Sequence, residues 1–250
     1  MLLLLPPDFS ASLSFFLIAT AGVTSFITAA LGAGGGIVLL GVMAQVLPPT
    51  LIVPLHGIVQ LGSNASRATL NWRHIDWPLL KPFSAGSLLG AAVGSWLLIS
   101  LDPAVMYLTI AAFILFLCWG PSLPKGALTP SGIFAASSAT GFITLFVGAT
   151  GPLVGAFIKQ MYTQRHVTIA TFAAAMTFQH IVKVGVFSYA GVEIIQWLPL
   201  LCAMIASGTL GTWLGLKLLS YIPDYQFSRV FDIILTLLAF RLIWQALSLW

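Results

Sequence analysis

The chain has 250 residues, of which 59% are hydrophobic and only 6% are charged, and its formal net charge is +4. Soluble domains carry about 25% charged residues, and a soluble fold of this size could not cover so much apolar surface. The cations are scattered along the chain, which excludes a nucleic-acid-binding surface. We therefore expect an integral membrane protein surrounded by a lipid bilayer.

Ten apolar segments follow one another along the chain, most of them near the roughly 20 residues that cross a bilayer as a helix. They occupy residues 10–31, 35–47, 50–71, 78–100, 103–119, 131–149, 152–163, 167–190, 195–219 and 225–247. Residues 1–7 lack the basic start of a signal peptide, so we expect no cleavage. Lipid cannot satisfy free backbone groups, and the short alternating segments of barrel strands are missing. The fold class that we predict is therefore an all-α, polytopic membrane helix bundle.

The two halves of the chain share an ordered series of features. Residues 27–36 (ITAALGAGGG) resemble residues 143–152 (ITLFVGATGP). Further on, Gly86, Gly90 and Gly94 resemble Ser207, Gly211 and Gly215, and each series is followed by a turn with Pro and Asp, at 102–103 and 223–224. We infer two repeats of five segments, 1–122 and 123–250, which together form one membrane domain.

Cations at the connections indicate the orientation, because Lys and Arg favour the cytoplasmic side. Five crossings per half place all the cation-bearing connections inside, namely 67–81, Lys125, 159–166 and 217–229. Four crossings per half would instead put Lys159, Arg165 and His166 outside. An odd number of crossings makes the halves inverted repeats with both termini outside. We leave open whether the short second segments cross fully or are re-entrant.

Each short second segment follows a glycine-rich break, at Gly34, Gly35 and Gly36 in the first half and at Gly148, Thr150 and Gly151 in the second. Matched short, interrupted segments point to the binding site in transporters. A bare helix N-terminus offers free N–H groups to an anion, and glycine allows a close approach. We predict that these residues bind substrate; close helix packing or a plain hairpin turn is the alternative. For the ridge at Gly86, Gly90 and Gly94 and its counterpart, we predict helix contacts only.

Polar residues form a stripe on the third segment of each half. In the first half the stripe consists of His56, Gln60, Asn64, Arg67 and Asn71, whose spacing puts them on one helix face. In the second half it consists of Gln179, His180 and Lys183, with Asn64 matching His180 and Arg67 matching Lys183. Polar groups inside a membrane segment face the protein interior or water.

Two cations at equivalent places, in a chain with few acids, favour an anion as their partner. We predict that Asn64, Arg67, His180 and Lys183 bind the substrate, and that His56, Gln60 and Gln179 are candidates for coupling. The alternatives are that Arg67 snorkels to the cytoplasmic surface and that the histidines are hydrogen-bonded packing residues.

Other chemistry is poorly represented in the sequence. Cys118 and Cys202 stand alone, which argues against a metal or redox site. No nucleotide-binding loop and no HExxH motif occur, so we expect no cofactor, no metal and no enzymatic activity. Arg229 and Asp232 are expected to pair on one helix. The tryptophans near segment ends are expected to anchor the protein at the membrane–water interface; they are residues 72, 77, 197, 244 and 250.

The order of these residues resembles that of the TauE/SafE family of membrane permeases, known as sulfite-exporter-like proteins. The likeness lies in residues 31–38 (LGAGGGIV), Leu47-Pro48-Pro49, residues 71–77 (NWRHIDW) and the ridge from Gly86 to Gly94, with a weaker copy from Gly148. Thr150 and Pro152 replace two glycines of the second copy. The resemblance implies a bacterial or archaeal inner-membrane permease for sulfite, sulfoacetate or related sulfonates, and it carries no family-wide catalytic signature.

The function that we expect is a secondary anion transporter working by alternating access, with the anion near the midplane and coupling to protons or sodium. An intramembrane enzyme, a passive anion channel and a pure assembly subunit are the alternatives. The sequence leaves open which anion is carried, the direction of transport, the coupling ion, and whether the chain forms a homodimer.

Overall fold

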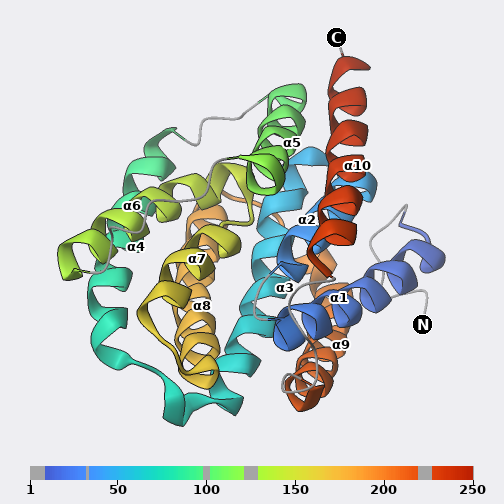
Figure 1. The fold of residues 1–250 in the computed structure, drawn as a ribbon. Helices are drawn as coiled ribbons and strands as arrows, with labels where there is room; N and C mark the ends of the chain where they lie inside the picture. The colour runs from blue at the N-terminus through green and yellow to red at the C-terminus, as the bar shows by residue number, and fades with distance from the viewer. Residues whose placement is uncertain (1–8, 32–33, 98–101, 121–128, 219–226, 250) are drawn as a thin grey trace.

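The computed structural model describes residues 9–31, 34–97, 102–120, 129–218 and 227–249, and these residues form a helical bundle without strands (Figure 1). Its ten α-helices lie close to the ten segments expected from the sequence, which confirms the all-α class. They are α1 (Ala11–Leu31), α2 (Gly35–Val46), α3 (Pro49–Leu70), α4 (Trp77–Leu97), α5 (Pro103–Trp119), α6 (Pro130–Val147), α7 (Gly151–Met161), α8 (Arg165–Tyr189), α9 (Leu198–Leu218) and α10 (Phe227–Leu247). Two 3-10 turns, η2 (Trp72–His74) and η3 (Ile195–Trp197), precede α4 and α9.

Length and apolar character set several of these helices apart from the short helices α2 and α7. Among the described residues, four stretches are both long and apolar enough to cross a membrane: Ala11–Ala30, Pro130–Val147, Arg165–Tyr189 and Ile195–Lys217. By contrast, α2 has 12 residues and α7 has 11. At about 1.5 Å per residue they reach roughly 17–18 Å, well short of a hydrocarbon core of about 30 Å. That α2 and α7 complete a crossing therefore stays a prediction.

Glycine and proline fix where the helices break. Gly34 precedes α2 with φ 106°, and Gly148 follows α6 with φ 81°, a backbone region that side chains with a Cβ rarely adopt. Proline stands in the first turn of α3, α5, α6 and α7, where its missing N–H leaves no helix bond unmade. Both α2 and α7, and likewise α3 and α8, begin 116 residues apart, which is the offset of the repeated motif.

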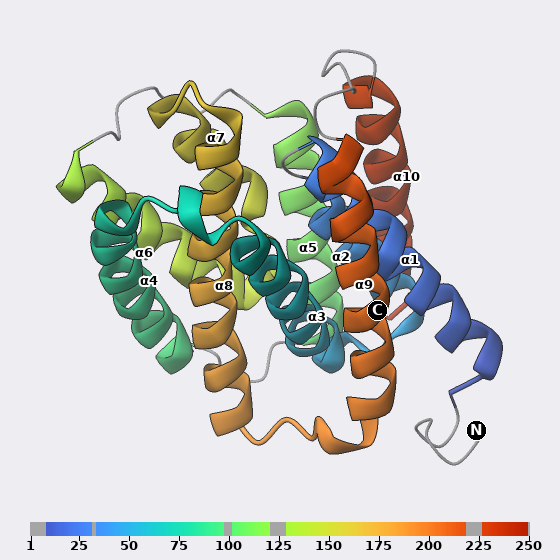
Figure 2. The same ribbon diagram turned by 90° about the horizontal axis from the view of Figure 1, so that it is seen from below.

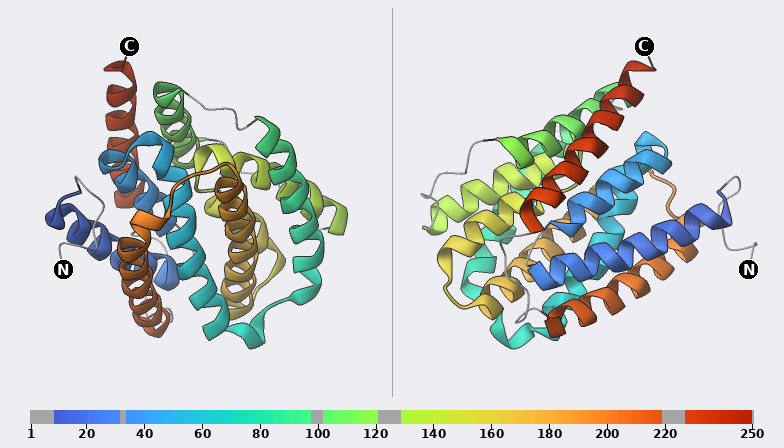
Figure 3. Two further views of the ribbon diagram at one scale, coloured as in Figure 1. Left: turned by 180° about the vertical axis from the view of Figure 1, so that it is seen from behind. Right: turned by 45° about the vertical axis from the view of Figure 1, so that its right-hand side comes forward.

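The helices pack in pairs that combine the two halves of the sequence. Two long-range pairs join equivalent helices, α3 with α8 and α5 with α10. The other two join the first helix of one half to the fourth of the other, α4 with α6 (Figure 2) and α1 with α9 (Figure 3). Such exchange is expected of two repeats related by a twofold axis; the inversion of the repeats stays a prediction.

Small residues let two of these pairs approach to backbone contact. A Cβ added to Gly90 of α4 would lie 1.9 Å from the Ser138 carbonyl oxygen of α6, and one on Gly211 of α9 would lie 2.0 Å from the Gly22 carbonyl oxygen of α1. The prediction that the two glycine ridges make close helix contacts is therefore confirmed. Both contacts run between the halves, so residues 1–122 and 123–250 are interleaved.

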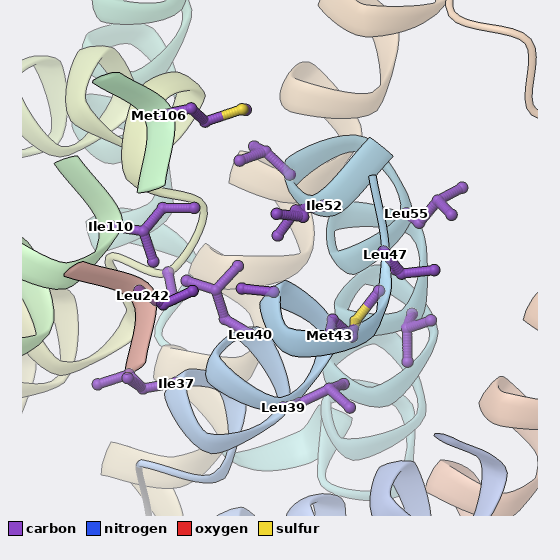
Figure 4. Packing of buried hydrophobic residues seen from close by; sticks show 14 of the residues in the cluster. Ile37, Leu39, Leu40, Met43, Leu47, Ile52, Leu55, Met106, Ile110 and Leu242 are labelled. Carbon is purple, nitrogen blue, oxygen red and sulfur yellow. The ribbon is translucent and has the colours of Figure 1, made fainter. Parts of the chain in front are cut away.

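The main apolar core surrounds the short helix α2. Ile37, Leu40 and Met43 of α2 pack with Ile110 of α5 and Leu242 of α10 (Figure 4). Because α2 is packed by protein in this way, its N-terminus at Gly34 and Gly35 is held at a fixed place inside the bundle. The α6–α7 break approaches the same region, since the Cβ position of Gly148 lies 2.9 Å from a methyl group of Leu40.

Candidate functional site

The polar stripes of α3 and α8 face the inside of the bundle. His56, Gln60, Asn64 and Arg67 of α3 are buried, as are Gln179, His180 and Lys183 of α8. Asn71, at the end of the first stripe, is half-buried and donates from Nδ2 to the Arg67 carbonyl at 3.1 Å. The inward orientation predicted from the spacing is confirmed; the roles of these residues in binding stay a prediction.

A basic side chain holds a carbonyl oxygen at each helix break. His56 Nε2 lies 2.8 Å from the Gly36 carbonyl, which can only accept, so Nε2 carries the hydrogen. Lys183 Nζ donates to the Gly148 carbonyl at 2.7 Å. Lys183 also lies against α3, because a Cβ on Gly57 would come within 2.8 Å of its Cε. The α3–α8 pair thus anchors both breaks.

A hydrogen-bonded chain supports the second break. Thr150 Oγ1 donates to Gln179 Oε1 at 2.7 Å, and Gln179 Nε2 donates to Thr140 Oγ1 at 3.2 Å. All three side chains are buried. The amide of Gln179 therefore uses both of its ends to tie α6, α8 and the start of α7 together.

A small cavity of about 30 Å³ lies where the two breaks meet the stripes. Of the site residues predicted from the sequence, it brings together Gly34, Gly36, Gly151, His56, Gln60, Asn64 and His180. The His56 and His180 rings are 6.4 Å apart between centroids, at an interplanar angle of 80°. Thr28 adds to the polar side of the lining, and Phe172 and Met176 are among the residues of its apolar side.

Six predicted site residues lie outside this lining. Gly148, Thr150, Gln179 and Lys183 belong to the hydrogen bonds that fix the second break. Gly35 packs against α1, its Cβ position only 1.8 Å from the Thr24 carbonyl oxygen. Arg67 lies one helical turn beyond Asn64 on the same face of α3.

Arg67 is the most unusual buried group. Its side chain is 0% exposed, and none of its three guanidinium nitrogens has a hydrogen-bond partner among the residues that the structure describes. The alternative that Arg67 snorkels to the surface is therefore wrong. An uncompensated buried charge costs several kcal/mol, and such a residue inside a membrane protein marks a functional site by default.

Unpartnered polar atoms also belong to the cavity lining. His56 Nδ1, His180 Nδ1 and Asn64 Oδ1 have no partner within the described part of the chain. The cavity has room for about two water molecules, which could satisfy some of these atoms. An acceptor oxygen and two imidazole nitrogens make the lining suitable for a polar ligand.

The connections next to η2 are tied to the second half by polar contacts. Tyr162 donates to Asp76 Oδ2, and the Asp76 backbone N–H donates to Thr171 Oγ1 at 3.0 Å. Burial, followed by the hydrogen bond to Asp76, raises the pKa of Tyr162, which lies in the α7–α8 connection. His74 and His166 stack with ring centroids 5.5 Å apart.

Four residues at the site were not predicted from the sequence: Thr28, Thr140, Phe172 and Met176. The two threonines carry a detectable signal, because Thr24 and Thr28 recur at the repeat offset as Thr140 and Thr144. Phe172 and Met176 carry none, since apolar residues on a membrane helix do not stand out.

One expectation about the tryptophans is wrong, and several other expectations concern residues that the structure does not describe. Trp197 is not a lipid-facing anchor: it is 5% exposed and packs edge-on against Phe9. Trp72, Trp77 and Trp244 are exposed, as expected for interface anchors. The Arg229–Asp232 pair, Lys125, Trp250 and the turn at 223–224 lie outside the residues or side chains that are described.

None of the described carboxylates lies on the stripes. The three acidic side chains that the structure describes, Asp76, Asp102 and Glu193, all lie at helix ends or in connections. Among the described residues there is also no group of three His, Cys, Asp or Glu side chains that could hold a metal ion. The interior of the site therefore carries cations and neutral polar groups.

Comparison with known proteins assigns the chain to a family. The family model described as Sulfite exporter TauE/SafE matches residues 17–242. No curated protein and no solved structure matches significantly. The matched range includes all ten helices in whole or in part, both glycine breaks and both polar stripes. The chain thus belongs to the TauE/SafE sulfite exporter family of integral membrane transport proteins.

Proposed function

We propose that this chain is a secondary transporter that moves a small sulfur-containing anion across the cytoplasmic membrane of a bacterium or archaeon by alternating access. Sulfite, which the family description names, is a candidate substrate, and sulfoacetate and other sulfonates are candidates of similar chemistry. The carrying observation is Arg67, a fully buried guanidinium with no partner among the described residues. Its planar fork of donors matches an oxyanion in two-point contact.

The two helix breaks supply a second source of attraction for an anion. Gly34 and Gly36 at the start of α2 and Gly151 at the start of α7 line one cavity. The first amides of a helix have no partner inside the helix, and the helix dipole adds partial positive charge there. An anion placed between these ends would meet N–H donors from both halves of the chain.

Substrate binding on this plan requires movement. The cavity of about 30 Å³ holds about two waters, and an oxyanion is several times larger than one water. Movement of α1–α9 and α4–α6 relative to the α3–α8 pair would open the cavity, because α3 and α8 carry the stripes whereas the other two pairs are locked by backbone contact. This is our proposal for alternating access.

His56 is the proposed site of coupling. Its Nε2–H is committed to the Gly36 carbonyl, which leaves Nδ1 free to take a proton. His180 faces the same cavity. A proton on either ring would offset the charge of an entering anion; sodium bound by backbone carbonyls at the breaks is the alternative.

The test is substrate counterflow in proteoliposomes containing the purified chain. Labelled sulfite should accumulate against unlabelled sulfite or sulfoacetate, and Arg67→Lys should weaken the apparent affinity by about tenfold or more, because a point charge replaces the bidentate fork. Arg241→Lys, at an exposed arginine in α10, is the matched control and should behave as wild type.

The counterflow result separates the alternatives. A passive channel would conduct without counterflow, and an intramembrane enzyme would turn over a lipid or peptide without any gradient. Equal affinities for the wild type and Arg67→Lys, with both proteins folded, would remove Arg67 from the substrate site.

A further inference from the structure

A large groove opens on the outer face of the bundle between α3, η2, α4 and α8. It measures about 630 Å³, within the range of roughly 300–1,000 Å³ typical of ligand sites. Figure 2 shows α8 between α3 and α4, the three helices that surround the groove. Its lining includes Ala68, Trp72, Trp77, Lys81, Ala174 and Phe178.

The walls of the groove are suited to a hydrocarbon chain. Ala68 of α3 and Ala174 of α8 make room between the two helices, while Phe178 lines the α8 side. The core of a bilayer contains no water, so an apolar surface at that depth is covered by hydrocarbon. An acyl chain of a lipid would cover it without leaving a polar backbone group unsatisfied.

The mouth of the groove has a different chemistry. Trp72 and Trp77 are 58% and 59% exposed there, as aromatic residues are at the level of lipid headgroups. Lys81 is exposed in the lining, and the Arg73 guanidinium carbon lies 5.6 Å from the Trp72 ring centroid. The mouth therefore carries two cations.

The nearby acid Asp76 is hydrogen-bonded to other groups. It accepts the Tyr162 hydroxyl at Oδ2 and the Leu79 N–H at Oδ1, and within the described part of the chain it forms no ion pair with Lys81 or Arg73. Both cations can therefore meet a ligand. The distribution of cations along the chain places this connection on the cytoplasmic side, where anionic lipids attract basic residues next to membrane helices.

We propose that this groove binds an anionic phospholipid, with an acyl chain between α3 and α8 and the phosphate at Lys81 and Arg73. The site is distinct from the anion cavity, because Ala65, Ala68, Ala174 and Phe178 lie on the outward sides of the helices that carry the stripes. The proposal stands whether or not the chain transports sulfur oxyanions.

Native mass spectrometry of the purified chain in detergent tests the proposal. Phosphatidylglycerol should be retained more tightly than phosphatidylcholine with identical acyl chains. Lys81→Gln should weaken phosphatidylglycerol binding about fivefold and leave phosphatidylcholine unchanged. Lys159→Gln is the matched control: Lys159 is an exposed cation of α7 outside the groove, and its loss should have no effect.

A second variant tests the apolar wall. Ala174→Phe should fill the groove and weaken both lipids, with the thermal midpoint of the empty protein unchanged. Equal retention of the two lipids, equal effects of Lys81→Gln and Lys159→Gln, or displacement of the lipid by inorganic phosphate alone would each overturn the proposal. A second copy of the chain seated in the groove, seen as a lipid-free dimer that Ala174→Phe dissociates, would overturn it as well.

Discussion

A buried ammonium group needs more than one partner, and Lys183 has one among the described residues. Its single hydrogen bond goes to the Gly148 carbonyl, although an ammonium carries three donors. The remaining capacity lies at the seam of α3 and α8, next to Gly57. Lys183 is therefore placed both to hold the α6–α7 break and to meet an incoming anion.

Replacing Lys183 by Gln is expected to lower transport at least roughly thirtyfold, since losing one member of a buried charge contact costs about 2–5 kcal/mol. The amide can still donate to Gly148, so membrane insertion should be normal. Uptake into proteoliposomes measures the first effect and yield in the membrane fraction the second. Lys159→Gln serves as the control; normal uptake by Lys183→Gln would show that the cation is structural.

The stripes could be predicted at the residue scale because helical periodicity alone puts His56, Gln60, Asn64 and Arg67 on one face. The hydrogen-bond partners of the stripe residues could not be predicted. Lys183 and Gly148, for example, are 35 residues apart in the chain, and the sequence holds no signal for their contact. Burial of Arg67 was equally hidden, because a snorkelling arginine and a buried one occupy the same position near a helix end.

At the scale of elements, α4 and α6 form one of the closest contacts between helices. Gly90→Ala should destabilise the protein by about 1–3 kcal/mol, because the new methyl group would meet the Ser138 carbonyl oxygen, 1.9 Å away. The matched control is Gly185→Ala in α8, where nothing lies within 4 Å; it should be neutral or slightly stabilising. Thermal unfolding in detergent compares the two, and equal midpoints would mean that α4 and α6 can separate at no cost.

The Tyr162–Asp76 hydrogen bond joins two connections and should make stability depend on pH. Burial and Asp76 raise the pKa of Tyr162 above that of an unfolded tyrosine, so its contribution is complete below about pH 10 and decreases as the pH rises through the folded-state value. Tyr162→Phe should lower the unfolding midpoint at pH 7. It should also flatten the decline of the midpoint above about pH 10; an unchanged decline would show that other groups cause it.

Helix positions followed well from the sequence, because glycine and proline mark the breaks: α2 and α7 begin at Gly35 and Gly151, next to the residues expected. Helix partners did not follow. Small-residue ridges predict close contact but carry no information about which helix is contacted, so the pairing of α4 with α6 and of α1 with α9 required the structure.

For the whole molecule, ligand-dependent stability tests whether a site of the proposed kind exists. Sulfite, sulfate, thiosulfate, sulfoacetate, taurine, acetate and phosphate should be compared in thermal unfolding of the detergent-solubilised chain. A ligand at a hundred times its Kd stabilises the folded state by about 2.7 kcal/mol, so a bound sulfur oxyanion should raise the midpoint clearly. Arg67→Gln should remove the shift. No response to any anion would count against the anion site and turn attention to cations.

Interleaving of the halves has a consequence for how the protein is made. A face of small residues on α1, which ends at Leu31, is covered by α9, which begins only at Leu198; this face consists of Ala21, Gly22, Ser25 and Ala29. Translation at about 5–20 residues per second separates these two helices by roughly 10–30 s. Throughout that interval the newly made α1 exposes a ridge that fits other small-residue helices. We therefore expect the first half expressed alone to be a substrate for membrane proteases.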